Sequence, residues 1–239
     1  MQPYPFIPEA LKQSMHLDTE SVAIIGFIQS CSIALGFSLI TLLFPKQTAL
    51  KYWTTSLWLT TVGEAFLGLR AHLPEAFSVM VGNSFFALAN VLMVLGVARH
   101  VRQSTPLWKP FIIAVLMMSG FALYFFIWPD IVVRIQLFSL GTITWDIWII
   151  WLLLKYGPID ARLSCRLAAG AFGLDTLNFI IRLVLPISVS SDQDILFTGT
   201  YLAFSHIVSI IVMLTICFAL LLLIFEKLMV DLRKQAHTD

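Results

Sequence analysis

Seven long apolar stretches follow one another along the chain, separated by short polar segments. Each has about 18–26 residues, close to the ~20 that a helix needs to cross the hydrocarbon core of a bilayer. Because lipid offers the backbone no hydrogen-bond partners, each stretch is predicted to be a helix. The predicted spans are 21–44, 53–70, 77–98, 110–128, 131–154, 165–187 and 200–225.

The composition of the 239 residues supports this interpretation, since 59% are hydrophobic, only 12% are charged and the mean hydropathy is +0.88. A soluble domain usually carries about 25% charged residues. The chain is therefore not expected to be a soluble enzyme, a nucleic-acid-binding protein or a disordered protein. The predicted fold class is all-α, a polytopic membrane protein built as a seven-helix transmembrane bundle.

The positions of lysine and arginine predict the orientation of this bundle, because such residues concentrate in cytoplasmic loops. If there are seven spans, eleven of the fifteen basic residues lie on one side, in the first, third and fifth loops and in the C-terminal segment. The other four are Lys12, Arg70, Arg134 and Arg182. We therefore expect the N-terminus outside the cell and the C-terminus in the cytoplasm.

Polar residues inside the predicted spans are the candidates for function. A charged group at the bilayer centre costs about 2.5–3.5 kcal/mol on insertion scales, so each needs a partner or a role. Asp175, Asn178 and Arg182 follow one another at i, i+3 and i+7 and share one helix face. Such stripes, if turned inward, would line a cavity in the outer half of the bundle. The candidate ligand-binding residues are Glu64, Asn83, Arg134, Gln136, Trp145, Asp175, Asn178, Arg182, Tyr201 and His206.

Two interpretations of these residues stay open. In the first, the arginines and the histidine hold an anionic group, an acid holds an ammonium group, and the aromatic residues form the walls of a pocket. The expected ligand is then a small polar, zwitterionic or lipid-like signal. In the second, the polar side chains only hold the helices together, as they commonly do in membrane bundles.

Several other membrane functions lack their sequence signals. The last span has no lysine for a retinal Schiff base, and no internal repeat with paired helix breaks indicates a repeat-built transporter. Motifs for phosphate binding, metalloproteolysis and serine hydrolysis are absent. Asp146 and Asp175 lie near mid-depth without the flanking motifs of an aspartyl protease. We expect no catalytic residue, metal or cofactor in this chain.

The C-terminal segment carries a second signal. Phe225, Leu228, Leu232 and Gln235 fall at the a and d spacing of a coiled coil. The last helix is therefore expected to continue into the cytoplasm and to begin a short coiled coil. A frayed amphipathic helix end is the alternative.

Residues 232–239 resemble the segment that leads into a GGDEF domain, the catalytic module of diguanylate cyclases. In that family the segment has the form L-x-x-x-A-x-T-D and continues as P-L-T-G-L-x-N-R. Leu232, Ala236, Thr238 and Asp239 match the first part. The rest of the chain is similar to the multi-helix membrane sensor domains that precede such cyclases, most visibly over 89–99.

The resemblance implies the sensor of a bacterial diguanylate cyclase in the inner membrane, cut just before its catalytic domain. It divides the chain into a periplasmic segment (1–20), a seven-helix sensor (21–225) and the start of a cytoplasmic signalling helix (226–239). A ligand would control cyclic di-GMP synthesis through the last helix and the geometry of a homodimer, because the family's catalysis needs two facing GTP-loaded domains.

The same resemblance places GTP and magnesium in the missing output domain, so this chain alone is not expected to be an enzyme. A sensor for another output, such as a histidine kinase, is an alternative. A small-solute carrier or channel is another.

Overall fold

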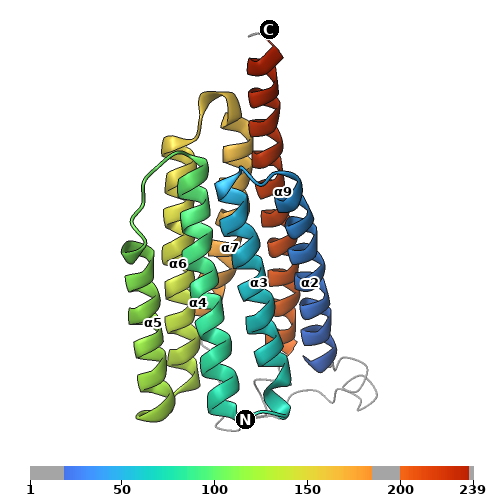
Figure 1. The fold of residues 1–239 in the computed structure, drawn as a ribbon. Helices are drawn as coiled ribbons and strands as arrows, with labels where there is room; N and C mark the ends of the chain where they lie inside the picture. The colour runs from blue at the N-terminus through green and yellow to red at the C-terminus, as the bar shows by residue number, and fades with distance from the viewer. Residues whose placement is uncertain (1–18, 185–199, 237–239) are drawn as a thin grey trace, which may run out of the picture.

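All regular elements within the described residues, 19–184 and 200–236, are helices in the computed structural model (Figure 1). The prediction of an all-α fold is confirmed, and a long helix occupies each predicted apolar stretch. The long helices are α2 (Thr19–Leu43), α3 (Thr48–Gly68), α4 (Glu75–His100), α5 (Trp108–Phe126), α6 (Ile131–Tyr156), α7 (Arg162–Val184) and α9 (Thr200–Ala236). Short 3-10 turns, η1 (Leu69–Ala71) and η2 (Ile159–Ala161), precede α4 and α7.

Six of these helices, all except α3, are long and apolar enough to cross a membrane by length and composition. The chain is thus a multi-pass membrane protein. Large apolar side chains also point outward, among them Leu42 on α2, Leu116 on α5 and Phe218 on α9. Exposed apolar faces of this extent suit contact with lipid rather than with water.

Helix α3 is less apolar than the rest because it carries five threonines, two tryptophans and Glu64. It packs between α2 and α4, with Leu50, Trp53 and Leu57 almost fully buried. Thr54, Ser56 and Thr61 of α3 are also buried, so part of its polar surface faces protein rather than lipid.

Six helices form a closed ring, in the order α2, α3, α4, α6, α7 and α9, with α9 returning to contact α2. Helix α5 lies outside this ring, against both α4 and α6 (Figure 1). The amide of Gln29 on α2 donates a hydrogen bond to the carbonyl of Ile210 on α9 at 3.0 Å, which links the first and last helices of the ring.

The α2–α3, α4–α5 and α6–α7 connections meet at one end of the bundle, where α9 also extends past its neighbours (Figure 1). We call this the basic end, because most of the lysines and arginines of the described residues gather there. They are Lys46, Lys51, Arg99, Arg102, Lys109, Lys155, Arg162, Arg166, Lys227 and Arg233.

Local signals set where individual helices begin and end. The carboxylate of Asp130 accepts hydrogen bonds from the backbone N–H groups of Val132 and Val133 at 2.9 and 3.1 Å, and so caps the start of α6. At the end of α4, Arg102 has a positive φ of 58°. The next N–H, that of Gln103, returns to the carbonyl of Ala98 at 2.8 Å, which is the bond of a Schellman cap.

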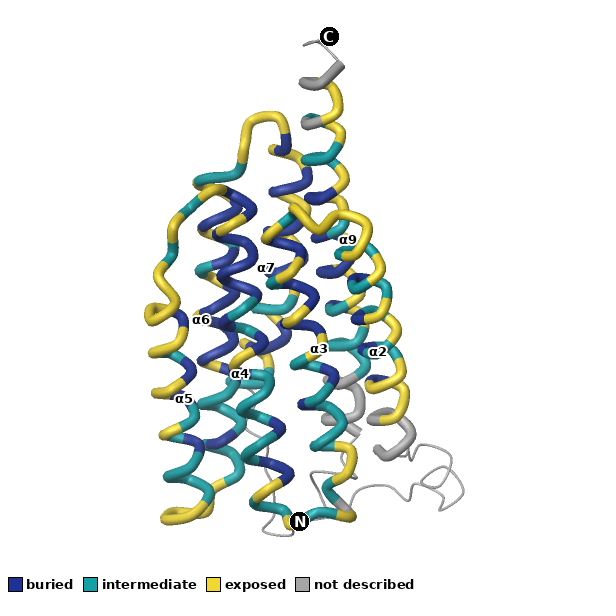
Figure 2. Tube along the Cα trace, in the orientation of Figure 1, coloured by how far each residue is buried: buried dark blue, intermediate teal, exposed yellow. Residues whose placement is uncertain are grey.

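The two halves of the bundle differ in packing. Buried residues concentrate in the halves of α4, α6 and α7 nearest the basic end (Figure 2). The core there includes Trp145, Ile149 and Leu223, all inaccessible to solvent. The opposite half contains more partly exposed residues, because a cavity lies between its helices. The solid half supports the ring, and the hollow half is where a ligand has room.

Candidate functional site

A cavity of about 450 Å³ lies inside the ring, in the half away from the basic end. Each of the seven long helices contributes to its walls. Polar and charged side chains are numerous for a membrane interior. They are Gln29, Ser30, Ser56, Thr60, Glu64, Arg70, Asn83, Asn90, Arg134, Thr142, Asp146, Asp175, Arg182 and Ser209.

Three arginines mark the end of the cavity farthest from the basic end. Arg70 lies in η1, Arg134 in the first turn of α6 and Arg182 in the last turn of α7, so all three belong to the same end of the bundle. Arg70 forms an ion pair with Glu75 at the start of α4. Glu75, Arg70 and Asp130 are the charged groups that act on Arg134.

Arg134 is nine-tenths buried, with 9% of its surface exposed. Its guanidinium lies over two aromatic rings, 4.7 Å from the centroid of Phe125 and 5.8 Å from that of Phe121. The Nε atom has no hydrogen-bond partner within the described part of the chain. Arg182 lies in the same way over the ring of Phe179, at 5.2 Å. Cation–π contacts of this kind hold a guanidinium plane in place.

Acidic groups line the cavity deeper in the bundle. Asp146 on α6 is 1% exposed, and its Oδ2 atom has no hydrogen-bond partner among the described residues. Its other contacts are the charge of Asp175 on α7 and a hydrogen bond with Thr176. Asp175 in turn interacts with the charge of Arg182, two turns along the same helix.

A third acid, Glu64, faces the cavity from α3. Ser30 of α2 forms a hydrogen bond with it, but its Oε2 atom has no partner within the described residues. Buried polar atoms are normally hydrogen-bonded, so each exception calls for an explanation. Here the exceptions in Glu64, Arg134 and Asp146 belong to residues that line the same cavity.

Phenylalanines form much of the apolar wall. They come from four different helices: Phe86, Phe121, Phe138, Phe172 and Phe179. The ring of Phe138 lies 6.2 Å from that of Phe86 and 6.4 Å from that of Phe179, measured between centroids. Charged groups set between aromatic walls can bind and orient a small organic molecule.

Of the ten residues predicted from the sequence, the structure brings five to this cavity. These are Glu64, Asn83, Arg134, Asp175 and Arg182. The remaining five fall into two groups, three residues that hold helices together and two whose side chains lie outside the described part.

Gln136, Asn178 and Trp145 connect helices and are not part of the cavity lining. The Gln136 amide donates to the carbonyl of Leu183 at 3.5 Å. The Asn178 amide donates to the Ser209 hydroxyl at 3.0 Å and joins α7 to α9. The Trp145 indole donates to the carbonyl of Pro110 at 3.2 Å. For these three the structure favours the packing interpretation.

Tyr201 and His206 lie in the first turns of α9, outside the residues whose side chains the structure describes. Their predicted roles as an aromatic wall and an anion contact stay predictions.

The predicted set omits Asp146, Ser30, Gln29 and the phenylalanine walls. Asp146 follows Thr142 by one helical turn, and both line the cavity, so the polar stripe of α6 was the available signal. Ser30 and Gln29 lie in an otherwise apolar stretch and carry no charge. Phenylalanine is equally common on lipid-facing surfaces, so sequence alone does not identify a wall.

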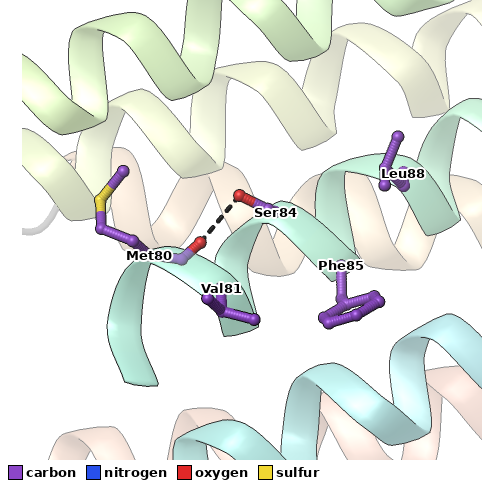
Figure 3. A pocket seen from close by; sticks show the side chains of 5 residues that line it. All are labelled: Met80, Val81, Ser84, Phe85 and Leu88. Carbon is purple, nitrogen blue, oxygen red and sulfur yellow. Dashed lines mark hydrogen bonds between the residues drawn. The ribbon is translucent and has the colours of Figure 1, made fainter. Parts of the chain in front are cut away.

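A second, shallow groove of about 260 Å³ lies on α4, lined by Met80, Val81, Ser84, Phe85 and Leu88 (Figure 3). The Ser84 hydroxyl, the one polar side-chain group of these five residues, donates to the Met80 carbonyl of its own helix at 2.8 Å. The Ser84 proton is therefore used within the helix, and the mainly apolar residues of the groove suit contact with lipid.

Within the described part of the chain, no group of three or more His, Cys, Asp or Glu side chains could hold a metal ion. No protein-family model matches the chain, and no curated protein or solved structure matches it either. What can be said of its function therefore depends on the geometry of the cavity and on the sequence of its last helix.

Proposed function

We propose that this chain is the membrane sensor domain of a bacterial diguanylate cyclase. A small ligand binds in the cavity, and α9 transmits its presence to a GGDEF domain that follows Asp239. That domain would bind GTP and magnesium and make cyclic di-GMP. This chain would carry out no catalysis itself.

The main support is the combination of the cavity with a continuous output helix. Ser209, Ile210, Met213 and Ile216 of α9 line the cavity, and the same helix continues without a break to Ala236. A ligand that contacts these residues acts directly on the element that ends in the GGDEF-like segment. The ligand can shift the equilibrium between two positions of α9 only to the extent that it binds one of them more tightly than the other.

The basic end of the bundle supports the proposed orientation. If α3 also crosses the membrane, the chain has seven spans, with its N-terminus outside and its C-terminus in the cytoplasm of a bacterial inner membrane. The basic residues then face the cytoplasm, as the positive-inside rule requires. The cavity then lies in the outer half, where a signal from outside the cell reaches it.

Contacts between α9 and the rest of the basic end provide a route for the signal. The Lys227 ammonium donates to the Gln47 side-chain carbonyl at 2.7 Å, which ties α9 to the residue before α3. Lys227 also acts electrostatically on His100, the last residue of α4. A shift of α9 would break or reform these contacts before it reaches the output domain.

A partner copy completes the proposal, because the family's output needs two facing catalytic domains. Near its C-terminal end, α9 exposes Phe225, Met229 and Leu232 on one side. The exposed set differs from the predicted a/d positions, since Leu228 packs against the core of its own bundle. We propose that the exposed face pairs α9 helices in a parallel homodimer.

The direct test of this function is to read the source gene past the codon for Asp239. Continuation as P-L-T-G-L-x-N-R and then a GGDEF signature would support the proposal. A histidine-kinase domain there would keep the sensor but change its output. A stop codon directly after Asp239 would refute the proposal, because no catalytic domain would then follow the sensor.

A carrier for a small solute is the second candidate, and the observation that favours it is the cavity between helices. It predicts uptake of a charged solute into vesicles that contain only this chain. The sensor proposal predicts ligand binding without uptake, so the two are distinguishable in the same vesicles.

A further inference from the structure

Two acids that interact with each other, Asp146 of α6 and Asp175 of α7, line the cavity. Asp146 is 1% exposed, and its Oδ2 atom has no hydrogen-bond partner within the described residues. Among the described residues, Asp146 forms a hydrogen bond with Thr176, and the charge that acts on it is that of another acid, Asp175. Asp175 in turn interacts with the charge of Arg182. Burial of a carboxylate beside a like charge is strongly unfavourable unless a cation or a proton accompanies it.

The groups around this pair are suited to an organic cation. Thr142 lies one turn before Asp146 on α6, and Phe172 lies one turn before Asp175 on α7, so they share the cavity-facing sides of their helices. Phe179 follows Asp175 by one turn, and its ring lies 6.4 Å from that of Phe138. Aromatic faces attract cations as well as apolar groups.

We infer that Asp146 and Asp175 bind the ammonium group of a small organic amine, with the amine's apolar part against Phe138, Phe172 and Phe179. This inference depends on the proposed function, since it names the ligand class of the cavity. It goes beyond the earlier expectation of a small polar, zwitterionic or lipid-like signal by committing to one charge at one place.

Along the helix axes, the acid pair lies deeper in the bundle than the arginines. Asp146 and Arg134 are twelve residues apart on α6, which is about 18 Å along the helix axis. Asp175 and Arg182 are seven residues apart on α7, or about 10 Å. The acids and the arginines therefore lie toward different ends of the cavity, and the charge of Arg182 still acts on Asp175.

Bare metal ions fit these walls less well than an organic amine. Calcium requires six to eight oxygen ligands, whereas Phe138, Phe172 and Phe179 line the same cavity as this acid pair. Within the described residues, no group of three potential metal-binding side chains is present. An alkyl- or arylammonium ion fits both features, because its head needs few oxygens and its body needs apolar walls.

The test measures thermal unfolding of the purified chain in lipid nanodiscs with three probes of similar size. These are 2-phenylethylamine, 2-phenylethanol and 3-phenylpropanoate. We expect the amine alone to raise the unfolding midpoint in a saturable way. Equal stabilisation by the alcohol would show that the charge of the ligand does not contribute to binding. Stabilisation by the carboxylate alone would indicate that the ligand binds the arginines instead of the acids. Either result, or no effect of the amine, overturns the inference.

Variants assign the effect to the acid pair. Asp175→Asn is expected to weaken binding of 2-phenylethylamine by about 30-fold or more, because it removes one partner of a buried charge pair. Asp160→Asn is the matched control, since it removes an exposed acid of η2 and is expected to leave binding unchanged. Asp146→Asn is a second test if the variant folds. Unchanged amine binding in folded Asp175→Asn overturns the inference.

The outcomes also separate this inference from the proposed function. Amine binding by this chain, with no change in cyclic di-GMP output from the full-length protein, would refute the cyclase proposal and leave the amine site standing. Control of the cyclase by a non-amine ligand would support the cyclase proposal and refute the amine site.

Discussion

Trp53 of α3 is fully buried because Gly96 of α4 leaves room for its indole ring. The ring also packs against the imidazole of His100, with centroids 5.7 Å apart. A side chain at Gly96 would overlap the indole, which has no space to retreat in the solid half of the bundle. Close contact through a small residue is a common way for membrane helices to pack.

Gly96→Ala is therefore expected to lower the stability by about 1–3 kcal/mol, the usual cost of overpacking a core. The measurement is thermal unfolding of the purified protein in detergent. Gly170→Ala is the matched control, because a Cβ at Gly170 meets no atom within 4 Å. The control is expected to be neutral or slightly stabilising, since alanine favours helix more than glycine does. Equal destabilisation by both variants would contradict the packing described here.

Asn178 and Glu64 allow the packing and ligand-binding interpretations to be separated. Asn178→Ala is expected to lower the stability by about 0.6–1.7 kcal/mol, the range measured for hydrogen bonds between membrane helices. Glu64→Gln is expected to leave the unfolding midpoint unchanged or raised, because it removes a buried charge with an unpartnered oxygen. Unfolding of the Glu64→Gln protein would show that this acid holds the helices together.

At this scale the sequence predicts which residues are unusual but not what each one does. Charges in apolar stretches are costly, and for this reason Glu64, Arg134 and Asp175 could be recognised from the sequence. Asn178 looks identical to Asn83 in the sequence, yet one bonds to a neighbouring helix and the other lines the cavity. That difference depends on how each helix is rotated in the bundle, which no local pattern determines.

The positions of the helices along the chain are predicted well from the sequence, because the length and hydropathy of an apolar stretch are local properties. The boundaries moved mainly where polar residues continue a helix beyond the hydrocarbon core. Helix α3 begins at Thr48, before the predicted start at residue 53. The predicted continuation of the last helix beyond residue 225 is confirmed, since α9 extends to Ala236. A prediction based on apolar residues alone stops at the edge of the membrane, whereas the backbone hydrogen bonds continue.

The residues exposed on α9 differ from those that the sequence predicts for a dimer contact. Its exposed residues alternate in steps of four and three, as in a coiled coil. They are Phe218, Leu222, Phe225, Met229 and Leu232. The predicted positions included Leu228, which instead packs on the bundle. A hydrophobic pattern of two heptads did not distinguish the exposed face of α9 from the face toward the chain's own core.

Disulfide cross-linking tests this face. In a variant whose three native cysteines are alanine, Met229→Cys is expected to form a covalent dimer in membranes upon mild oxidation. Leu228→Cys is the adjacent control and is expected to remain monomeric on a denaturing gel. Efficient cross-linking through Leu228→Cys alone would show that the partner contacts the other side of α9.

At the scale of the whole molecule, the ring of six helices has a packed half and a hollow half. The packed half lies at the basic end and fixes the helices relative to one another. The hollow half contains the charged groups of opposite sign, with Arg134 and Arg182 at its far end and Asp146 and Asp175 deeper. Because α9 runs through both halves, an event in the cavity has a continuous path to the C-terminal segment.

The existence of a polar cavity could be predicted from the stripes of polar residues, but its composition could not. The cavity includes side chains from all seven long helices, and their arrangement depends on the order of helices in the ring. Helix α5 illustrates this, since its hydropathy is close to that of α4 and α6, yet it packs outside the ring and contributes Phe121. Long-range packing decides such details.

The most direct test of the central claim is the amount of cyclic di-GMP that the full-length protein makes in membranes. The comparison is between the unaltered protein, Asp175→Asn in the cavity and Asp160→Asn in η2, at equal expression and equal stability. Asp175→Asn is expected to shift the output of cyclic di-GMP, and Asp160→Asn is expected to leave it unchanged. A full-length protein that makes no cyclic di-GMP, or an output unaffected by Asp175→Asn, would contradict the central claim.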